Sequence, residues 1–115
     1  MGNVRVEKEY EEFQKTGTTV DADVAVLDLD TRRRDCLSIL IKNTGGANGL
    51  TYTVKEKAKY GGDLINAETP ANIAFGAQVQ LTVTAKYYAE YIIYVKAQVG
   101  SSQTTYEIEA IQKGG

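Results

Sequence analysis

Five aspartates lie close together in the first third of the chain, at Asp21, Asp23, Asp28, Asp30 and Asp35. Carboxylate oxygens suit calcium, which takes about six to eight oxygen ligands, usually from a loop that folds back on itself. The spacing and glycine of an EF-hand loop are missing here. We therefore expect ordinary solvated carboxylates and no metal. A cation site formed by Asp21, Asp23, Asp28 and Asp30 stays as the weaker alternative.

The residues that most often carry catalysis are scarce. The chain has no histidine, which removes the commonest general base and the commonest transition-metal ligand. Cys36 is the single cysteine, so it has no partner for an intramolecular disulfide, and we expect a small buried apolar residue. The glycine pairs 45–46 and 61–62 match neither a phosphate-binding loop nor a dinucleotide fingerprint, and they predict turns. We expect no enzymatic activity and no cofactor.

Aromatic and basic residues supply the candidates for contact with a partner. The run at residues 32–34 is three arginines, which predicts a charged turn or an intersubunit salt-bridge patch. Tyrosine buries a large area while keeping a polar tip, and this suits either a sheet face or an interface. The interface candidates are Tyr10, Phe13, Arg32, Arg33, Arg34, Tyr87 and Tyr88.

Length and composition narrow the function further. With 115 residues, 43% of them hydrophobic and 24% charged, the chain resembles one ordinary globular domain. The net charge of -2 disfavours a general nucleic-acid-binding role. No apolar run approaches the roughly 18 residues of a membrane-spanning helix, and the charged N-terminus lacks the apolar core of a signal peptide. We expect no membrane partner, and synthesis and folding in a reducing cytoplasm.

The elements that would hold these residues are strands. Residues 50–58, 77–85 and 104–111 alternate apolar and polar side chains, a period typical of strands with one buried face. Residues 36–41 and 91–95 are apolar on both faces and predict central strands. In residues 20–31 the apolar side chains change from one face of the strand to the other. Val24 and Val26 share one face, and Leu27 and Leu29 share the opposite face. A β-bulge near Val26 would bring all four into one core; a strand buried on both sides is the alternative.

Turn residues separate these segments every 8–12 residues or so, which predicts seven to eight short strands. We place turns or loops at 43–49, 60–63, 68–72 and 100–103. The fold class is all-β: an antiparallel β-sandwich, either immunoglobulin-like or jelly-roll-like, with a charged N-terminal arm. Residues 1–19 form this arm or an edge strand, and residues 20–113 form the sandwich. Residues 5–15 are compatible with a short helix, a strand or an extended arm.

Three segments carry a resemblance to a known group: VAVLDLD at 24–30, LSILIKNTG at 37–45 and YIIYVKAQVG at 91–100. Together with a final strand, they are similar to small β-sandwich virion structural proteins of tailed bacteriophages, of the capsid decoration (cement) or head-tail accessory type. The resemblance covers about residues 20–112 and matches no functional residue. It implies a non-enzymatic subunit that binds and stabilises an assembled shell, with the major capsid protein or other virion subunits as partners and the virion as its location.

Two points stay open at this stage. Self-association into a homo-oligomer is compatible with the charged arm. A small carbohydrate-binding or adhesive module, assisted by calcium at the aspartates, is the alternative function.

Overall fold

The structure, a computed structural model, describes residues 10–30, 36–57, 64–84 and 90–113. These residues form eight β-strands. The strands are β1 (Tyr10–Thr18), β2 (Val24–Asp30), β3 (Cys36–Asn43), β4 (Leu50–Lys57), β5 (Ile65–Ile73), β6 (Gln78–Thr84), β7 (Glu90–Ala97) and β8 (Thr105–Lys113). The described residues include no helix long and apolar enough to cross a membrane.

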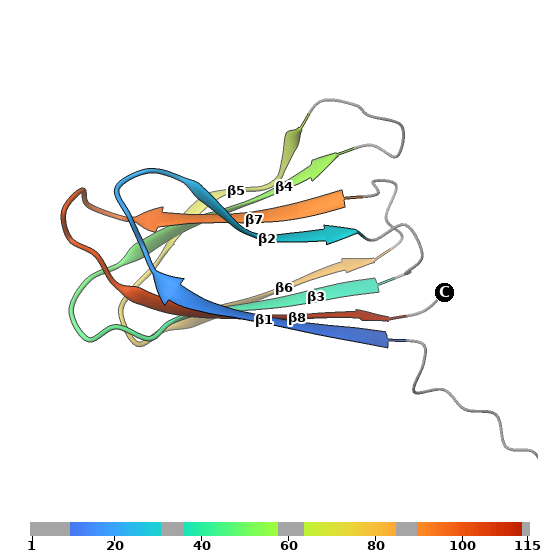
Figure 1. Cartoon of the computed structure of the whole chain (residues 1–115), viewed down its shortest axis with the longest axis horizontal. Coiled ribbons are helices and arrows are strands. Elements are labelled where there is room, and N and C mark those ends of the chain that lie inside the picture. Colours follow the sequence, from blue (N-terminus) through green and yellow to red (C-terminus); the bar gives the residue numbers. More distant parts are fainter. Residues whose placement is uncertain (1–9, 31–35, 58–63, 85–89, 114–115) are drawn as a thin grey trace, which may run out of the picture.

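The strands form two four-stranded antiparallel sheets that face each other (Figure 1). The first sheet has the order β1-β8-β3-β6, and the second has the order β2-β7-β4-β5. The antiparallel pairs β1–β8, β2–β7, β3–β6 and β4–β5 are those of one long hairpin that is folded over into two sheets. This arrangement is the eight-stranded jelly roll. The predicted β-sandwich is confirmed, and the strand order selects the jelly roll over the immunoglobulin-like alternative.

The core lies between the two sheets and follows the alternation seen in the sequence. On β8, Tyr106, Ile108 and Ala110 are buried. On β4, Leu50, Tyr52 and Val54 are buried, as the pattern predicted. Val79, Leu81 and Val83 of the edge strand β6 pack against this core while remaining partly exposed.

The irregular alternation in β2 comes from a β-bulge, as predicted, but Val24 does not enter the core. The pairing of β2 with β7 shifts register between Ala25 and Leu27, so a bulge lies at Val26. Leu29 is buried, and Val26 and Leu27 pack against the core. Val24, however, is 43% exposed, so the expectation that all four apolar residues enter one core is wrong. Val24 is the first residue of an edge strand, where fewer neighbours cover a side chain.

The two strands predicted to be central are central. β3 lies between β8 and β6, and β7 lies between β2 and β4. On β7 three successive residues, Tyr91, Ile92 and Ile93, are buried, so both of its faces are covered. On β3 only alternate residues are buried, and the outward ones are half-buried. Cys36 is one of these half-buried residues, not the fully buried residue that the sequence suggested.

One expected loop is a strand. Residues 68–72, which include the only proline, lie inside β5 and do not form a loop. β5 is an edge strand, where a missing backbone N–H is tolerated. Its pairing with β4 shifts on both sides of Val54, so Thr69 and Pro70 fall in an irregular stretch. The edge position and the bulge together accommodate Pro70.

Candidate functional site

The outer face of the first sheet carries polar side chains in cross-strand rows. Gln14 of β1 lies opposite Glu109 of β8, which in turn lies opposite Leu40 of β3. In the next row, Glu107 of β8 lies between Thr16 and Lys42. Strands far apart in the sequence thus bring two carboxylates, one amide and one ammonium group onto one surface.

Direct contacts link these polar groups. The side-chain amide of Gln14 donates a hydrogen bond to Oε2 of Glu107 at 2.6 Å. Nζ of Lys42 lies 3.7 Å from Oε1 of Glu107 and 3.9 Å from Oε2 of Glu109. All of these groups reach solvent, so each pair adds little to stability. The lysine thus bridges the two carboxylates, and the amide holds one of them.

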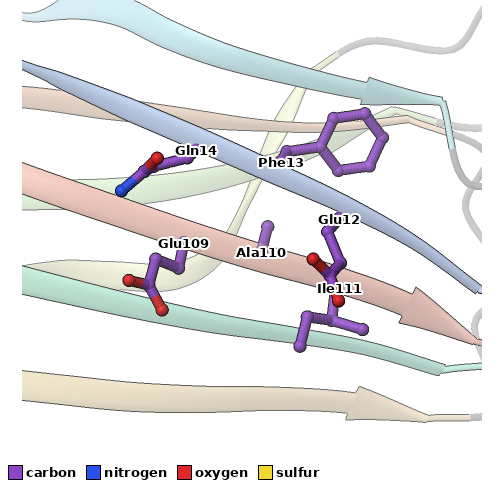
Figure 2. Close-up of a pocket in the computed structure, with 6 residues that line it drawn as sticks. All are labelled: Glu12, Phe13, Gln14, Glu109, Ala110 and Ile111. Carbon is purple, nitrogen blue, oxygen red and sulfur yellow. The ribbon is translucent and has the colours of Figure 1, made fainter.

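Two shallow depressions open on this face. The larger has a volume of about 450 Å³ and runs along β1 and β8, and Figure 2 shows the residues around it. Its lining consists of Glu12, Phe13, Gln14, Glu109, Ala110 and Ile111. The smaller, of about 190 Å³, is lined by Ser38, Ile39, Leu40, Gln80, Glu109 and Ile111. Glu109 and Ile111 line both depressions, so an acidic group and an apolar side chain lie together on this face.

The loops at one end of the sandwich are organised around a single buried amide, that of Asn43 at the end of β3. Asn43 is 1% exposed. Its Nδ2 donates to the carbonyl oxygens of Asn48 at 2.9 Å and Ile73 at 3.0 Å. Its Oδ1 accepts from the backbone N–H of Gly45 at 3.1 Å and from the hydroxyl of Thr104 at 2.7 Å. One side chain therefore connects the β3–β4 loop, the end of β5 and the β7–β8 loop.

The β1–β2 loop joins the same end through further hydrogen bonds. Thr19 and Thr104 exchange backbone and side-chain bonds, with Thr19 N donating to Thr104 O at 2.8 Å and Thr104 N donating to Oγ1 of Thr19 at 3.0 Å. Asp21 accepts from the backbone N–H of Ser101 at 2.8 Å. Ser101 has a φ of 71°, which is uncommon for a residue with a side chain, so this carboxylate holds a strained turn. All four loops at this end are therefore fixed to the strands or to one another.

Large apolar side chains are exposed on three of these four loops. Val20 is 42% exposed, Phe75 is 53% exposed and Val99 is 61% exposed. They lie in the β1–β2, β5–β6 and β7–β8 loops, which meet at the left end of the view in Figure 1. We call Val20, Phe75 and Val99 the apolar tips. Each of the three exposes an apolar side chain on a loop that hydrogen bonds hold in place.

The outer face of the second sheet carries a different chemistry. Tyr94 of β7 faces outward, and Nζ of Lys55 lies 4.8 Å from the centroid of its ring. Thr53 lies directly opposite Tyr94 and is buried, although the alternation of residues 50–58 predicted an exposed threonine. Tyr91 on the same strand is buried between the sheets. The two tyrosines thus point to opposite faces of one strand.

Two tyrosines in the core have altered acidity. Burial raises the pKa of Tyr106 above its ordinary value of 10.0. Burial also raises the pKa of Tyr52, and the nearby carboxylate of Glu68 adds to this effect. Both phenols therefore stay protonated at neutral pH, and both rings pack in the core.

The predicted contact residues are placed as follows. Phe13 is half-buried on β1 and packs against the core. Tyr10 is the first residue of β1, and Figure 1 shows this strand at the edge of its sheet. The other five, Arg32, Arg33, Arg34, Tyr87 and Tyr88, lie outside the described residues. Of the two candidates that the structure describes, Phe13 lies beside a depression, but its ring points to the side of β1 opposite Glu12 (Figure 2).

The aspartates do not assemble in the part of the chain that the structure describes. Asp21 and Asp23 lie in the β1–β2 loop, Asp28 and Asp30 lie on β2, and Asp35 lies outside the described residues. Among the described residues, no three carboxylates or cysteines come close enough to hold a metal ion. The carboxylate of Asp21 is engaged by Ser101.

Sequence reasoning missed two features. The contact between Gln14 and Glu107 spans 93 positions, and no local pattern indicates it. The exposure of Phe75 had a signal in the sequence, because the glycine that follows it, Gly76, is typical of a turn. Gly76 has a φ of 75°, as the turn requires.

Comparison with known proteins gives matches in structure alone. No family model matches the chain, and no curated protein matches its sequence. A structure of Bacillus endospore appendages, described as a novel family of disulfide-linked pili, matches with a TM-score of 0.61 and 10% identity, covering 100% of this chain and 98% of the other. The SPBc2 prophage-derived protein YomS matches with a TM-score of 0.58 and 8% identity, covering 97% of this chain and 100% of YomS.

A chain from the acid-stable capsid of the Helicobacter pylori bacteriophage KHP30 is also similar. Its TM-score is 0.57 at 5% identity, and the match covers 92% of this chain and 88% of the capsid chain. These low identities establish the fold and nothing finer. At that level, the predicted likeness to small β-proteins of phage particles is confirmed.

Proposed function

We propose that this chain is a non-enzymatic structural subunit of a phage particle, most specifically a capsid decoration protein that binds and stabilises an assembled shell. Its partners are the major capsid protein or other virion subunits, and its place of action is the virion. Support comes from the jelly roll, a fold used by viral shells, and from its likeness to the prophage and phage-capsid chains.

The observation that carries the proposal is the set of apolar tips. Val20, Phe75 and Val99 are exposed on three loops of one end, and the buried amide of Asn43 and the paired threonines fix those loops. Binding through fixed loops loses little conformational entropy, so a small apolar contact can give a net gain in affinity. Repeated over many lattice sites, such a contact favours the assembled shell by mass action.

The test uses bare shells assembled from the major capsid protein that the same genome encodes. The purified chain is mixed with these shells, and bound protein and shell melting temperature are both measured. We expect binding that saturates and a melting temperature that rises with occupancy. Shells that bind no protein and melt unchanged would overturn the proposal.

A matched pair of variants locates the contact. Phe75→Ser removes an apolar tip, and we expect shell affinity to fall about tenfold or more, since burial of a phenylalanine side chain contributes about 1.5–3 kcal/mol. Ile65→Ser is the control, because Ile65 is 45% exposed but lies at the start of β5, at the opposite end of the sandwich. Equal losses from both variants would place the contact elsewhere.

A further inference from the structure

The edge strand β1 (Tyr10–Thr18) is the starting point, because it has neither a bulge nor a proline, two of the features that commonly prevent sheet edges from pairing. Within the described part of the chain, β8 is the only strand that pairs with β1, as Figure 1 shows. That pairing continues through all nine residues without a register shift. β1 therefore presents a regular row of backbone donors and acceptors on its outer side.

The other edges differ. β2 is interrupted by a bulge at Val26, and β5 contains Pro70 and an irregular register. Bulges and prolines are common protections of sheet edges. β6 is regular, but its seven residues, Gln78–Thr84, carry no charge that would select a partner or a register.

The residues of β1 are complementary to themselves when the strand runs antiparallel to a copy of itself. A two-fold axis normal to the sheet through Phe13 places Phe13 opposite its own copy. The same axis places Glu11 opposite Lys15 of the second copy, and Lys15 opposite Glu11. Opposite charges in directly facing positions stabilise an antiparallel pair. Both charged residues are exposed on β1, so the edge already presents them.

Neighbouring registers lack this complementarity. An axis through Glu12 or Lys15 places like charges directly opposite each other, which destabilises a strand pair. An axis through Gln14 places Phe13 opposite Lys15 and leaves Glu11 without a cationic neighbour in the second copy. A carboxylate accepts several hydrogen bonds, so contacts of Glu11 within its own chain do not prevent the pair across the axis.

We propose that two copies of this chain associate through antiparallel pairing of their β1 strands about Phe13, joining the two first sheets into one continuous eight-stranded sheet. The partner is a second copy, and the interface is isologous, with the same residues contributed from both sides. Phe13 supports this geometry, because its half-buried ring lies beside the open edge, on the opposite side of β1 from Glu12 (Figure 2). The proposal is independent of whether the chain binds a phage shell.

Charge reversal tests the register. The single variants Glu11→Lys and Lys15→Glu each place two like-charge pairs across the axis, so we expect the dimer dissociation constant to rise by at least about tenfold. The double variant restores opposite charges and is expected to return to within about threefold of the unaltered protein. Glu12→Lys is the matched control, because it makes the same change in net charge but faces the neutral Gln14 of the second copy.

Mixing gives a sharper outcome. A Glu11→Lys chain and a Lys15→Glu chain each repel their own kind but are complementary to each other. An equimolar mixture is therefore expected to form heterodimers at concentrations at which each variant alone is monomeric. Sedimentation equilibrium with one chain labelled measures this directly, and circular dichroism verifies that each variant is folded.

Zero-length carbodiimide coupling provides an independent readout. Glu11 and Lys15 of one chain are four residues apart on an extended strand, about 13 Å, so such a cross-link between them must join two copies. We expect hybrid cross-linked peptides from a mixture of isotopically light and heavy protein. A protein that stays monomeric up to about 1 mM, the range of the weakest specific contacts, would refute the proposal. So would a dimer that neither single charge reversal weakens.

Discussion

Replacing Asn43 with alanine removes the side chain that connects three loops at one end of the sandwich. In the folded protein this amide makes four hydrogen bonds, to the backbones of Asn48, Ile73 and Gly45 and to the hydroxyl of Thr104. The Ile73 and Thr104 bonds are buried, and the other two are partly buried. Truncation leaves all four partners in place and unsatisfied.

The expected loss follows from these four partners. A buried polar group that loses its partner costs about 1–3 kcal/mol, whereas water can reach a partly exposed one. Two buried partners at the lower part of this range and a small contribution from the other two give a loss of about 3 kcal/mol in the free energy of unfolding. For a chain of this length, that corresponds to a melting temperature lower by about 12 °C.

Denaturant unfolding, followed by circular dichroism, measures the change. The matched control is Asn72→Ala, which removes an asparagine whose hydrogen bond from Thr51 is exposed, and it is expected to change stability by less than about 0.5 kcal/mol. A loss below about 1 kcal/mol for Asn43→Ala would refute the reasoning, because the loops would then be held without this amide.

Two further predictions concern the same protein. Gly45→Ala places a methyl group on the hydroxyl of Thr104 and is expected to destabilise by about 2 kcal/mol or more, whereas Gly46→Ala meets nothing nearby and should be neutral in thermal unfolding; equal effects would contradict the close approach at Gly45. The raised pKa values of Tyr52 and Tyr106 mean that the unfolded chain loses these protons at lower pH than the folded chain. Stability is therefore retained below about pH 10 and falls above it, and Tyr106→Phe should lessen that fall in unfolding measured between pH 8 and pH 11.

The strands were predictable from the sequence because their signal is local. Alternation at residues 50–58, 77–85 and 104–111 requires only that one face of each strand be buried, and β4, β6 and β8 occupy these segments. The bulge at Val26 was predictable for the same reason, since a break in phase appears within a few residues. The exposure of Val24 was not predictable, because it depends on the position of β2 at the edge of its sheet.

The order of the strands has no local signature. β1 and β8 are adjacent although they stand at opposite ends of the sequence, and only long-range pairing decides this. The outer-face contacts of Gln14, Glu107 and Lys42 depend on that pairing and were missed with it. Pro70 led to the wrong prediction of a loop at residues 68–72. Proline indicates a loop unless the strand is known to lie at a sheet edge, as β5 does.

The buried amide of Asn43 holds the loop that exposes Phe75, and this matters for how strongly Phe75 can bind a partner. An exposed phenylalanine on a mobile loop would lose conformational freedom on binding and would gain little net affinity. Phe75 instead lies two residues after Ile73, whose carbonyl oxygen accepts a hydrogen bond from Nδ2 of Asn43, and directly before Gly76, which donates its N–H to the carbonyl oxygen of Asn43 at 2.9 Å. The tip is therefore fixed on both sides before any partner arrives. The proposed shell contact through the apolar tips therefore predicts that Asn43→Ala weakens shell binding even where the protein remains folded, whereas a contact made by the outer sheet faces would leave binding unchanged.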